Sequence, residues 1–262
     1  MSGFKLGKAA ELATVAIRVK DRDKMIAFYR DLVGFELKGE ENALAIMGTA
    51  KAKNEQLWLE ESPRADDHFG QVKKMQSFTL SIPTVSELAA IYNRFKVADY
   101  PIENEAIAET ITIHVIDPEE NHVKFIALQA NEVTTMEELA AMGNDENRYL
   151  SPEVHVRNVH LNVNDLSDEA AFLEGIVAIS QDESQINEQF HVSLNESPSE
   201  AIAIDSHKII GLEFLKFFVS EEKLLELEKL LNEQKKDFFI DKKKSILTIY
   251  DAIGVEWWFV RR

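Results

Sequence analysis

The residues that most often carry out chemistry are unevenly represented in this chain. It has seven histidines and no cysteine, so thiolate nucleophiles, disulfides and cysteine-based zinc sites are excluded. No His-Glu-x-x-His or Gly-x-Ser-x-Gly motif occurs, which removes the commonest zinc-protease and serine-hydrolase signatures. His114 and His122 flank a tight turn, and we expect both to be surface residues rather than ligands.

The charge of the chain limits its partners. Its 262 residues carry a formal net charge of -17 and are 45% hydrophobic, which is typical of a globular protein. Nucleic-acid surfaces need clustered lysine and arginine, so no nucleic-acid partner is expected. No segment approaches the roughly 18 apolar residues of a membrane span, and residues 1–10 lack the apolar core of a signal peptide. We therefore expect a cytoplasmic protein without membrane contact, and export without a leader peptide is the alternative.

The hydrophobic pattern predicts a repeated order of elements. Residues 14–20 alternate as in a strand, and residues 21–33 have helical spacing that ends at Gly34. Short strands are expected near residues 37, 44–47 and 57–63. The same order follows with a strand at 78–82, a helix to residue 96 that opens with a capping box at Thr84 and Glu87, and strands at 111–116 and 122–128. Each segment reads as one strand, one helix and three strands (βαβββ).

The second half of the chain repeats the first. Residues 159–165 match residues 15–21 in their apolar positions and final aspartate, and residues 194–198 match 59–63. The matches keep their order, which indicates a duplication. We predict an N-terminal domain over residues 1–130, a linker over residues 131–152 and a C-terminal domain over residues 153–262.

Three stretches carry a resemblance to a known family. The strand at residues 15–21 ends in an aspartate, the helix carries Ala27-Phe28-Tyr29-Arg30-Asp31 and ends in Val33-Gly34-Phe35, and residues 117–125 read Asp-Pro-Glu-Glu-Asn-His-Val-Lys-Phe. They resemble the glyoxalase, bleomycin-resistance and extradiol dioxygenase proteins of the vicinal oxygen chelate superfamily. Within it, the layout resembles the CppA proteins of streptococci, which are named as complement-degrading proteinases. The resemblance implies an α+β fold of two tandem glyoxalase-like domains, each with two βαβββ segments that form a curved mixed sheet around an open cleft.

The resemblance also implies where metal ligands would lie. The superfamily places His, Glu or Gln at the start of each segment's first strand and on its last strand. These positions hold Thr14, Trp58, Ser77 and Lys124 in the first domain and Asn158, Ser193, Glu213 and Trp258 in the second. One carboxylate cannot hold a metal ion alone, so we predict degenerate metal sites and no cofactor. The alternative is a displaced divalent-metal site of His160, Glu213 and Glu256.

Without a metal, the two predicted clefts are lined mainly by polar side chains. The first would hold Thr14, Arg18, Trp58, Ser77 and Lys124. Its cations could attract a carboxylate or phosphate, although Arg18 could instead pair with Glu60 or Glu61 at the rim. The second would hold Asn158, His160, Glu213, Glu256 and Trp258, which is a polar lining with an aromatic wall.

Three functions are compatible with the sequence. We expect a non-catalytic binding or regulatory protein that takes a small polar ligand or a protein partner. One alternative is a metal-dependent enzyme of glyoxalase, lyase or dioxygenase type with a displaced site. The other is a proteinase that acts on a complement protein, as the CppA resemblance implies. The sequence leaves open whether the protein is catalytic and whether it is a monomer or a homodimer.

Overall fold

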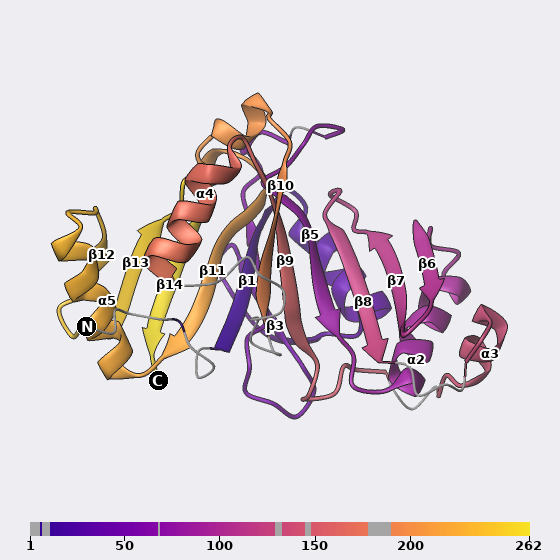
Figure 1. The fold of residues 1–262 in the computed structure, drawn as a ribbon. Coiled ribbons are helices and arrows are strands. Elements are labelled where there is room, and N and C mark those ends of the chain that lie inside the picture. The colour runs from indigo at the N-terminus through magenta and orange to yellow at the C-terminus, as the bar shows by residue number, and fades with distance from the viewer. Residues whose placement is uncertain (1–5, 7–10, 68, 129–132, 145–147, 178–189) are drawn as a thin grey trace. The chain divides into compact units, whose positions relative to one another are not determined.

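The computed structural model describes residue 6 and residues 11–67, 69–128, 133–144, 148–177 and 190–262 (Figure 1). The first βαβββ segment consists of β1 (Glu11–Val19), α1 (Arg22–Ala27), η1 (Phe28–Val33), β2 (Glu36–Glu41), β3 (Leu44–Gly48) and β4 (Leu57–Glu61). The second consists of β5 (Met75–Ser81), α2 (Val85–Val97), β6 (Asn104–Ile107), β7 (Thr110–Ile116) and β8 (His122–Leu128).

The second half begins after α3 (Met136–Ala141). It contains β9 (His155–Val163), α4 (Leu166–Phe172), η2 (Leu173–Val177), β10 (His191–Glu196) and the short helices η4 (Glu200–Ala203) and η5 (Ser206–Lys208). A further βαβββ segment follows with β11 (Gly211–Val219), α5 (Glu221–Glu233), β12 (Phe239–Ile240), β13 (Ile246–Tyr250) and β14 (Glu256–Arg261). The predicted α+β class is thereby confirmed, and three segments have the βαβββ order. Between α4 and β11 the described residues form one strand, β10, instead of three. Among the described residues, no helix is long and apolar enough to cross a membrane.

The described residues form two compact units, and each unit draws on both halves of the repeat. The β1–β11 unit comprises the described residues of Met1–Arg18, Arg64–Gln76 and Val159–Arg262. The β5–β8 unit comprises those of Val19–Pro63 and Ser77–Asn158. The first strand of the chain therefore lies with the last segment. The tandem division at residues 130 and 153 stays a prediction about the sequence repeat.

A mixed sheet with helices on one face forms the β1–β11 unit. Its strands follow the order β12-β13-β14-β11-β1, with β11 and β14 parallel and the other pairs antiparallel. Trp257 of β14 is fully buried, and its ring lies 5.4 Å from Phe172 of α4 and 5.4 Å from Phe217 of β11. The core of this unit therefore lies between the sheet and its helices.

The β5–β8 unit repeats this plan. Its strands follow the order β5-β8-β7-β6, with β5 and β8 parallel, while β2, β3 and β4 form an antiparallel meander. Helix α2 packs on one face of the sheet, where Phe95 lies 5.9 Å from Phe125. The side chains on the other face include the polar residues Thr79, His114 and Lys124.

The helix predicted over residues 21–33 changes its winding halfway. The Asp21 side chain accepts a hydrogen bond from the Lys24 backbone at 3.0 Å and starts α1. From Phe28 the chain continues as the π-helical turn η1, which Gly34 ends with a φ of 101°. Helix α4 passes into the π-helical η2 in the same way. The repeat therefore includes this local feature, which the apolar spacing alone did not predict.

Of the two hydrogen bonds in the capping box predicted at Thr84 and Glu87, one is present and the other is wrong. Thr84 Oγ1 does accept from the Glu87 backbone at 3.2 Å. The Glu87 carboxylate, however, accepts from the backbone and hydroxyl of Ser151 at 2.7 and 2.8 Å. A tertiary contact thus replaces the local one.

The described part of the predicted linker packs within the β5–β8 unit, where Leu150 is fully buried, while residues 131, 132 and 145–147 lie outside the described residues.

Candidate functional site

A β-bulge on β11 turns one carboxylate towards β1. In this strand pair Ala16 lies opposite Phe214 and Ile17 opposite Leu212, so Glu213 is an extra residue between paired positions. A bulge redirects the side chain that it inserts. The Arg18 guanidinium donates a hydrogen bond to the Glu213 carboxylate and forms an ion pair with it. The side chains are only 9% and 16% exposed, so the pair is a largely buried part of the sheet face.

An aromatic pair lies next to this ion pair. The parallel register of β11 and β14 sets Lys216 opposite Trp258 and Phe214 opposite Glu256. The Phe214 and Trp258 rings stack with centroids 4.4 Å apart and planes at 10°. The indole Nε1–H of Trp258 is buried and has no acceptor among the residues that the structure describes. A buried donor without an acceptor is costly, so this atom is suited to a ligand acceptor.

Charged groups surround the aromatic pair. Lys216 is buried on the same face, opposite Thr14 of β1. Tyr250 of β13 lies opposite Glu256. Burial raises the pKa of the Tyr250 hydroxyl, and the negative charges of Glu256 and Glu213 raise it further. We call the following six residues the Arg18 face: Arg18, Glu213, Phe214, Lys216, Glu256 and Trp258.

The predicted site residues divide between several strands. Thr14, Arg18, Glu213, Glu256 and Trp258 lie on neighbouring strands of the β1–β11 unit. Trp58 lies on β4, Ser77 and Lys124 lie on the neighbouring strands β5 and β8, and Asn158 and His160 lie on β9. Thr14 and Arg18 of the first predicted cleft thus lie on a strand that pairs with β11 of the second half. Arg18 has in Glu213 a partner 195 residues away, which local spacing had no means of indicating.

Two histidines that we expected to be separate surface residues are in contact. His114 Nε2 lies 2.9 Å from His122 Nδ1, and the rings are stacked at 5.0 Å. Both are half-buried. Burial lowers the pKa of His114 to about 4, and the charges of His122 and Lys124 act in the same direction. Their spacing across a five-residue turn was the available signal, because residues that flank a β-turn on the same face approach each other.

A buried lysine and serine were also missed by the sequence reasoning. Lys74 Nζ donates to the Ile253 carbonyl at 2.6 Å and to Ser206 Oγ at 3.1 Å. Ser206 Oγ in turn donates to the Gly254 carbonyl at 2.7 Å. Burial lowers the pKa of Lys74. Because the serine proton is directed at a carbonyl and not at the amine, the arrangement ties two loops together and does not activate a nucleophile.

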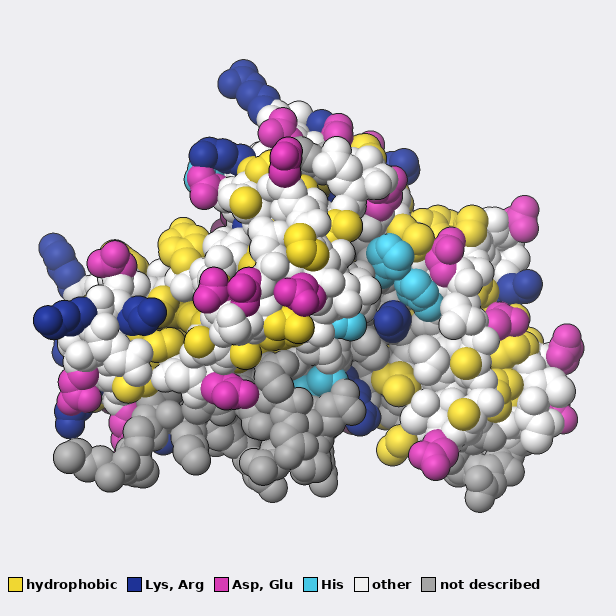
Figure 2. Space-filling view, turned by 45° about the horizontal axis from the view of Figure 1, so that its top comes forward, with side chains coloured by type: hydrophobic (Ala, Val, Ile, Leu, Met, Phe, Trp, Pro, Cys, Tyr) yellow, Lys and Arg dark blue, Asp and Glu magenta, His cyan; other side chains and the backbone are white. Residues whose placement is uncertain are grey.

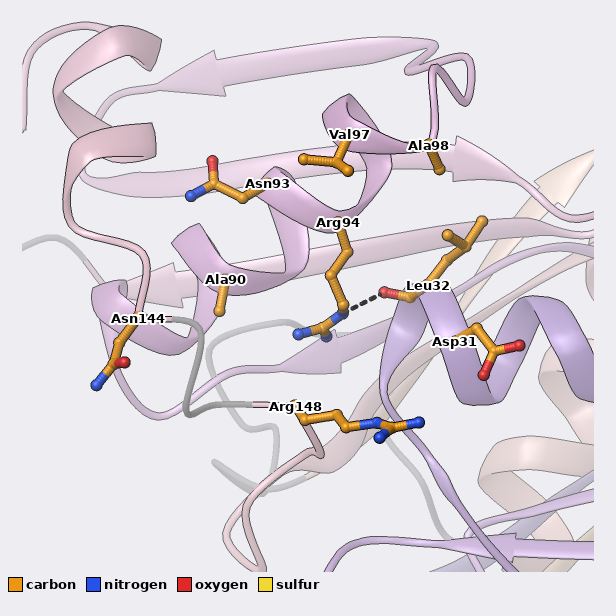
Figure 3. Close-up of a pocket in the computed structure, with 9 residues that line it drawn as sticks. All are labelled: Asp31, Leu32, Ala90, Asn93, Arg94, Val97, Ala98, Asn144 and Arg148. Carbon is orange, nitrogen blue, oxygen red and sulfur yellow. Dashed lines mark hydrogen bonds between the residues drawn. The ribbon is translucent and has the colours of Figure 1, made fainter.

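The β5–β8 unit contains a cavity of about 420 Å³. Figure 3 shows side chains that line it, among them Leu32, Ala90, Val97, Ala98 and two arginines. The guanidinium of Arg94 donates from Nε to the Leu32 carbonyl at 2.8 Å and from Nη2 to the Val33 carbonyl at 2.7 Å. These are the last carbonyls of η1, so Arg94 satisfies a helix end. These hydrogen bonds of Arg94 stabilise the fold. The Arg18 face is therefore the stronger candidate site.

Comparison with known proteins assigns the family. Residues 11–150 match the glyoxalase/bleomycin resistance protein/dioxygenase superfamily, which is more than half of the chain. The chain belongs to this superfamily. Residues 150–259 match the family described as CppA C-terminal. No match was found among curated proteins.

Solved structures of the superfamily share the fold. The cppA protein from Streptococcus pneumoniae TIGR4 has a TM-score of 0.65 at 16% identity, with 95% of this chain and 97% of that chain covered. Glyoxalase I from Zea mays has a TM-score of 0.57 at 14% identity, with 97% and 92% covered. Identities this low establish a common fold and leave the function open.

A metal ion of the kind that the superfamily implies does not fit the donor set found here. Among the implied positions Glu213 is the one carboxylate, and the Arg18 guanidinium already occupies it. The alternative ligands His160, Glu213 and Glu256 lie on β9, β11 and β14. Within the described part of the chain, no three His, Asp or Glu side chains are close enough to hold an ion.

Proposed function

We propose that this member of the superfamily is a binding protein that holds a small polar ligand at the Arg18 face without a metal ion. The observation that supports this is the buried ion pair between Arg18 and Glu213. A guanidinium is a permanent cation with several fixed N–H donors. It therefore supplies at Glu213 the positive charge that a metal ion would otherwise bring, together with directional hydrogen bonds.

The neighbouring side chains define the ligand class. The stacked Phe214 and Trp258 rings offer a flat apolar wall, and Trp258 Nε1–H offers a buried donor. Lys216 adds a second cation. A small molecule with a planar ring and a carboxylate would use all three features, since the ring would lie on the wall and the carboxylate would accept from the donors.

Neither alternative function has a comparable observation behind it. An enzyme with a displaced metal would need His160, Glu213 and Glu256 to meet around one ion, and no such group of three side chains occurs among the described residues. A serine proteinase would need an activated hydroxyl, whereas Ser206 donates its proton to a backbone carbonyl. We therefore advance the binding function alone.

The test uses protein without a histidine tag and three probes, benzoate, nicotinate and indole-3-acetate, in saturation-transfer NMR. We expect at least one probe to bind and its signal to be lost in Trp258→Phe, which keeps an aromatic ring but removes the N–H. Trp58→Phe in the other unit is the matched control and should bind normally. The pair variant Arg18→Met/Glu213→Leu removes both charges together, which avoids an unpaired buried ion, and should also lose binding.

Metal content is measured on the same preparation by mass spectrometry. We expect no ion whose presence depends on Glu213. A stoichiometric ion that disappears in Glu213→Gln would refute the proposal and identify a metalloenzyme. Equal probe binding by the parent protein and by Trp258→Phe would refute it as well, because the ligand would then lie elsewhere.

A further inference from the structure

The contact between His114 and His122 lies outside the Arg18 face and has no role in the proposed function. His114 is on β7 and His122 is on β8, and the register sets Ile116 opposite His122 and His114 opposite Lys124. The two histidines are therefore diagonal neighbours on one face of the sheet. Figure 2 shows two histidine side chains in contact at the surface of the molecule. Two side chains at such positions can bind one ion together.

The turn between the two strands fixes this pair. Asp117 is buried, and its carboxylate accepts from the backbones of Glu119 and Asn121 at 2.9 and 2.8 Å. The Tyr29 hydroxyl also donates to Asp117, at 2.8 Å. The turn is thus stabilised by its own backbone hydrogen bonds and by a hydrogen bond from Tyr29. Both imidazoles are presented by a rigid hairpin, which lowers the cost of ordering them around a ligand.

The spacing of the two ring nitrogens matches one kind of coordination. Two imidazole nitrogens bound at about 2.05 Å and at roughly 90° to each other lie about 2.9 Å apart, whereas tetrahedral ligands lie about 3.3 Å apart. Nε2 of His114 and Nδ1 of His122 are 2.9 Å apart, which is the length of the hydrogen bond between them and also the right-angle spacing. Right angles occur in square-planar, tetragonal and octahedral coordination, and Cu²⁺ and Ni²⁺ stand at the high end of the affinity order for imidazole ligands.

We propose that His114 and His122 form a two-histidine site for a divalent transition metal ion of the Cu²⁺ or Ni²⁺ class, with its remaining positions open to water or an anion. A contact of 2.9 Å between ring nitrogens requires one of them to act as acceptor, and that nitrogen is unprotonated as a ligand must be. The donor nitrogen loses its proton when the ion binds, and the same ring takes up a proton at its other nitrogen, so that both facing nitrogens can bind the ion.

Lys124 sets the strength and the selectivity of this site. Lys124 lies opposite His114 in the strand register, so its ammonium is close to the pair. That charge opposes any cation, and hard ions such as Mg²⁺ and Ca²⁺, which prefer oxygen ligands, gain little from two imidazoles. An ion with strong affinity for imidazole still binds, and Lys124 then favours an anion in an open position. We expect modest affinity for that reason.

The experiment titrates Cu²⁺ and Ni²⁺ into metal-stripped, tag-free protein by calorimetry. One ion per chain is expected, with at least about tenfold weaker binding in His114→Gln and in His122→Gln, since each removes one of two ligands. Lys124→Met should bind several-fold more tightly. His207→Gln changes an exposed histidine on η5 and is the matched control. Mg²⁺ is expected to give no heat of binding.

The spectrum of the Cu²⁺-loaded parent protein tests the site without any variant. Electron paramagnetic resonance is expected to show coupling to two imidazole nitrogens. Failure of the parent protein to bind either ion, or equal binding by the His114→Gln/His122→Gln double variant, would overturn the inference. Loss of an ion in Glu213→Gln but not in His114→Gln would count against the proposed function instead, so the two failures are distinguishable.

Discussion

At the scale of single residues, equivalent positions of the repeat carry different buried chemistry. Asp117 and Asp251 both precede the last strand of a segment, and both accept hydrogen bonds from the following turn. Asp117 has the Tyr29 hydroxyl as its further donor, whereas Asp251 has Trp257 Nε1, at 3.0 Å. Beside Asp251 lies Glu169, which is completely buried. Two acidic groups thus share one apolar region in the second half.

Glu169 makes the stability of the protein depend on pH. Burial raises its pKa to about 9, and the negative charge of Asp251 acts in the same direction. The folded state therefore keeps a proton that the unfolded state loses above the ordinary range of a glutamic acid, so stability falls as pH rises from about 5 to 9. In Glu169→Gln this fall should shrink by more than about 1 kcal/mol. Urea unfolding at several pH values measures it.

The control for this prediction is Glu233→Gln. Glu233 is exposed at the end of α5, so its replacement should leave the pH profile of the parent protein unchanged. A parent protein whose stability rises steadily between pH 5 and 9 would show that Glu169 is ionised in the folded state.

At the scale of elements, the π-helical turns determine where the helices of the repeat end. The last carbonyls of η1 accept hydrogen bonds from Arg94, and Gly34 ends the turn with a φ of 101°. Leu150 then donates to the Gly34 carbonyl at 2.7 Å. Gly34 therefore ends the helix, lies next to Arg94 and binds the segment before β9. The Val-Gly-Phe motif that contributed to the family resemblance has this structural function.

Replacing Gly34 by alanine should destabilise the protein by on the order of 2 kcal/mol. A Cβ at this position would lie 2.7 Å from Arg94 Nη2 and 3.0 Å from the Arg148 carbonyl, and the left-handed backbone is itself strained for alanine. Gly39 on β2 is the matched control, because a Cβ there meets no atom within 4 Å. Chemical denaturation should separate the two variants, and equal stabilities would contradict the assigned role of Gly34.

At the scale of the whole molecule, the pairing of β1 with β11 makes each half of the sequence incomplete. Seven positions from Glu11 to Arg18 pair with β11, and Ala16, Val15 and Ile17 are buried in that arrangement. A polypeptide of residues 1–152 lacks this partner strand. It would expose an apolar strand with unpaired backbone groups, which is a costly and aggregation-prone state.

We therefore expect residues 1–152 and 153–262, expressed separately, to lack cooperative thermal unfolding. When the two are co-expressed, β1 and β11 can pair, and a cooperative transition should return in a one-to-one complex. Circular dichroism and size-exclusion chromatography measure both properties. Cooperative unfolding of each half alone would instead support the tandem division at residues 130 and 153 as a division into independent domains.

The sequence by itself determined the class of this protein and its local elements. Alternating residues such as Val15, Ile17 and Val19 specify a strand face, and the repeated aspartates and glycines specify its turns, because these preferences act over a few neighbouring residues. Only the tertiary structure decided which segments pair, and so brought Arg18 to Glu213 and Glu87 to Ser151. Such contacts depend on which apolar faces bury each other across the chain, and a bulge of one residue at Glu213 decides where a carboxylate points.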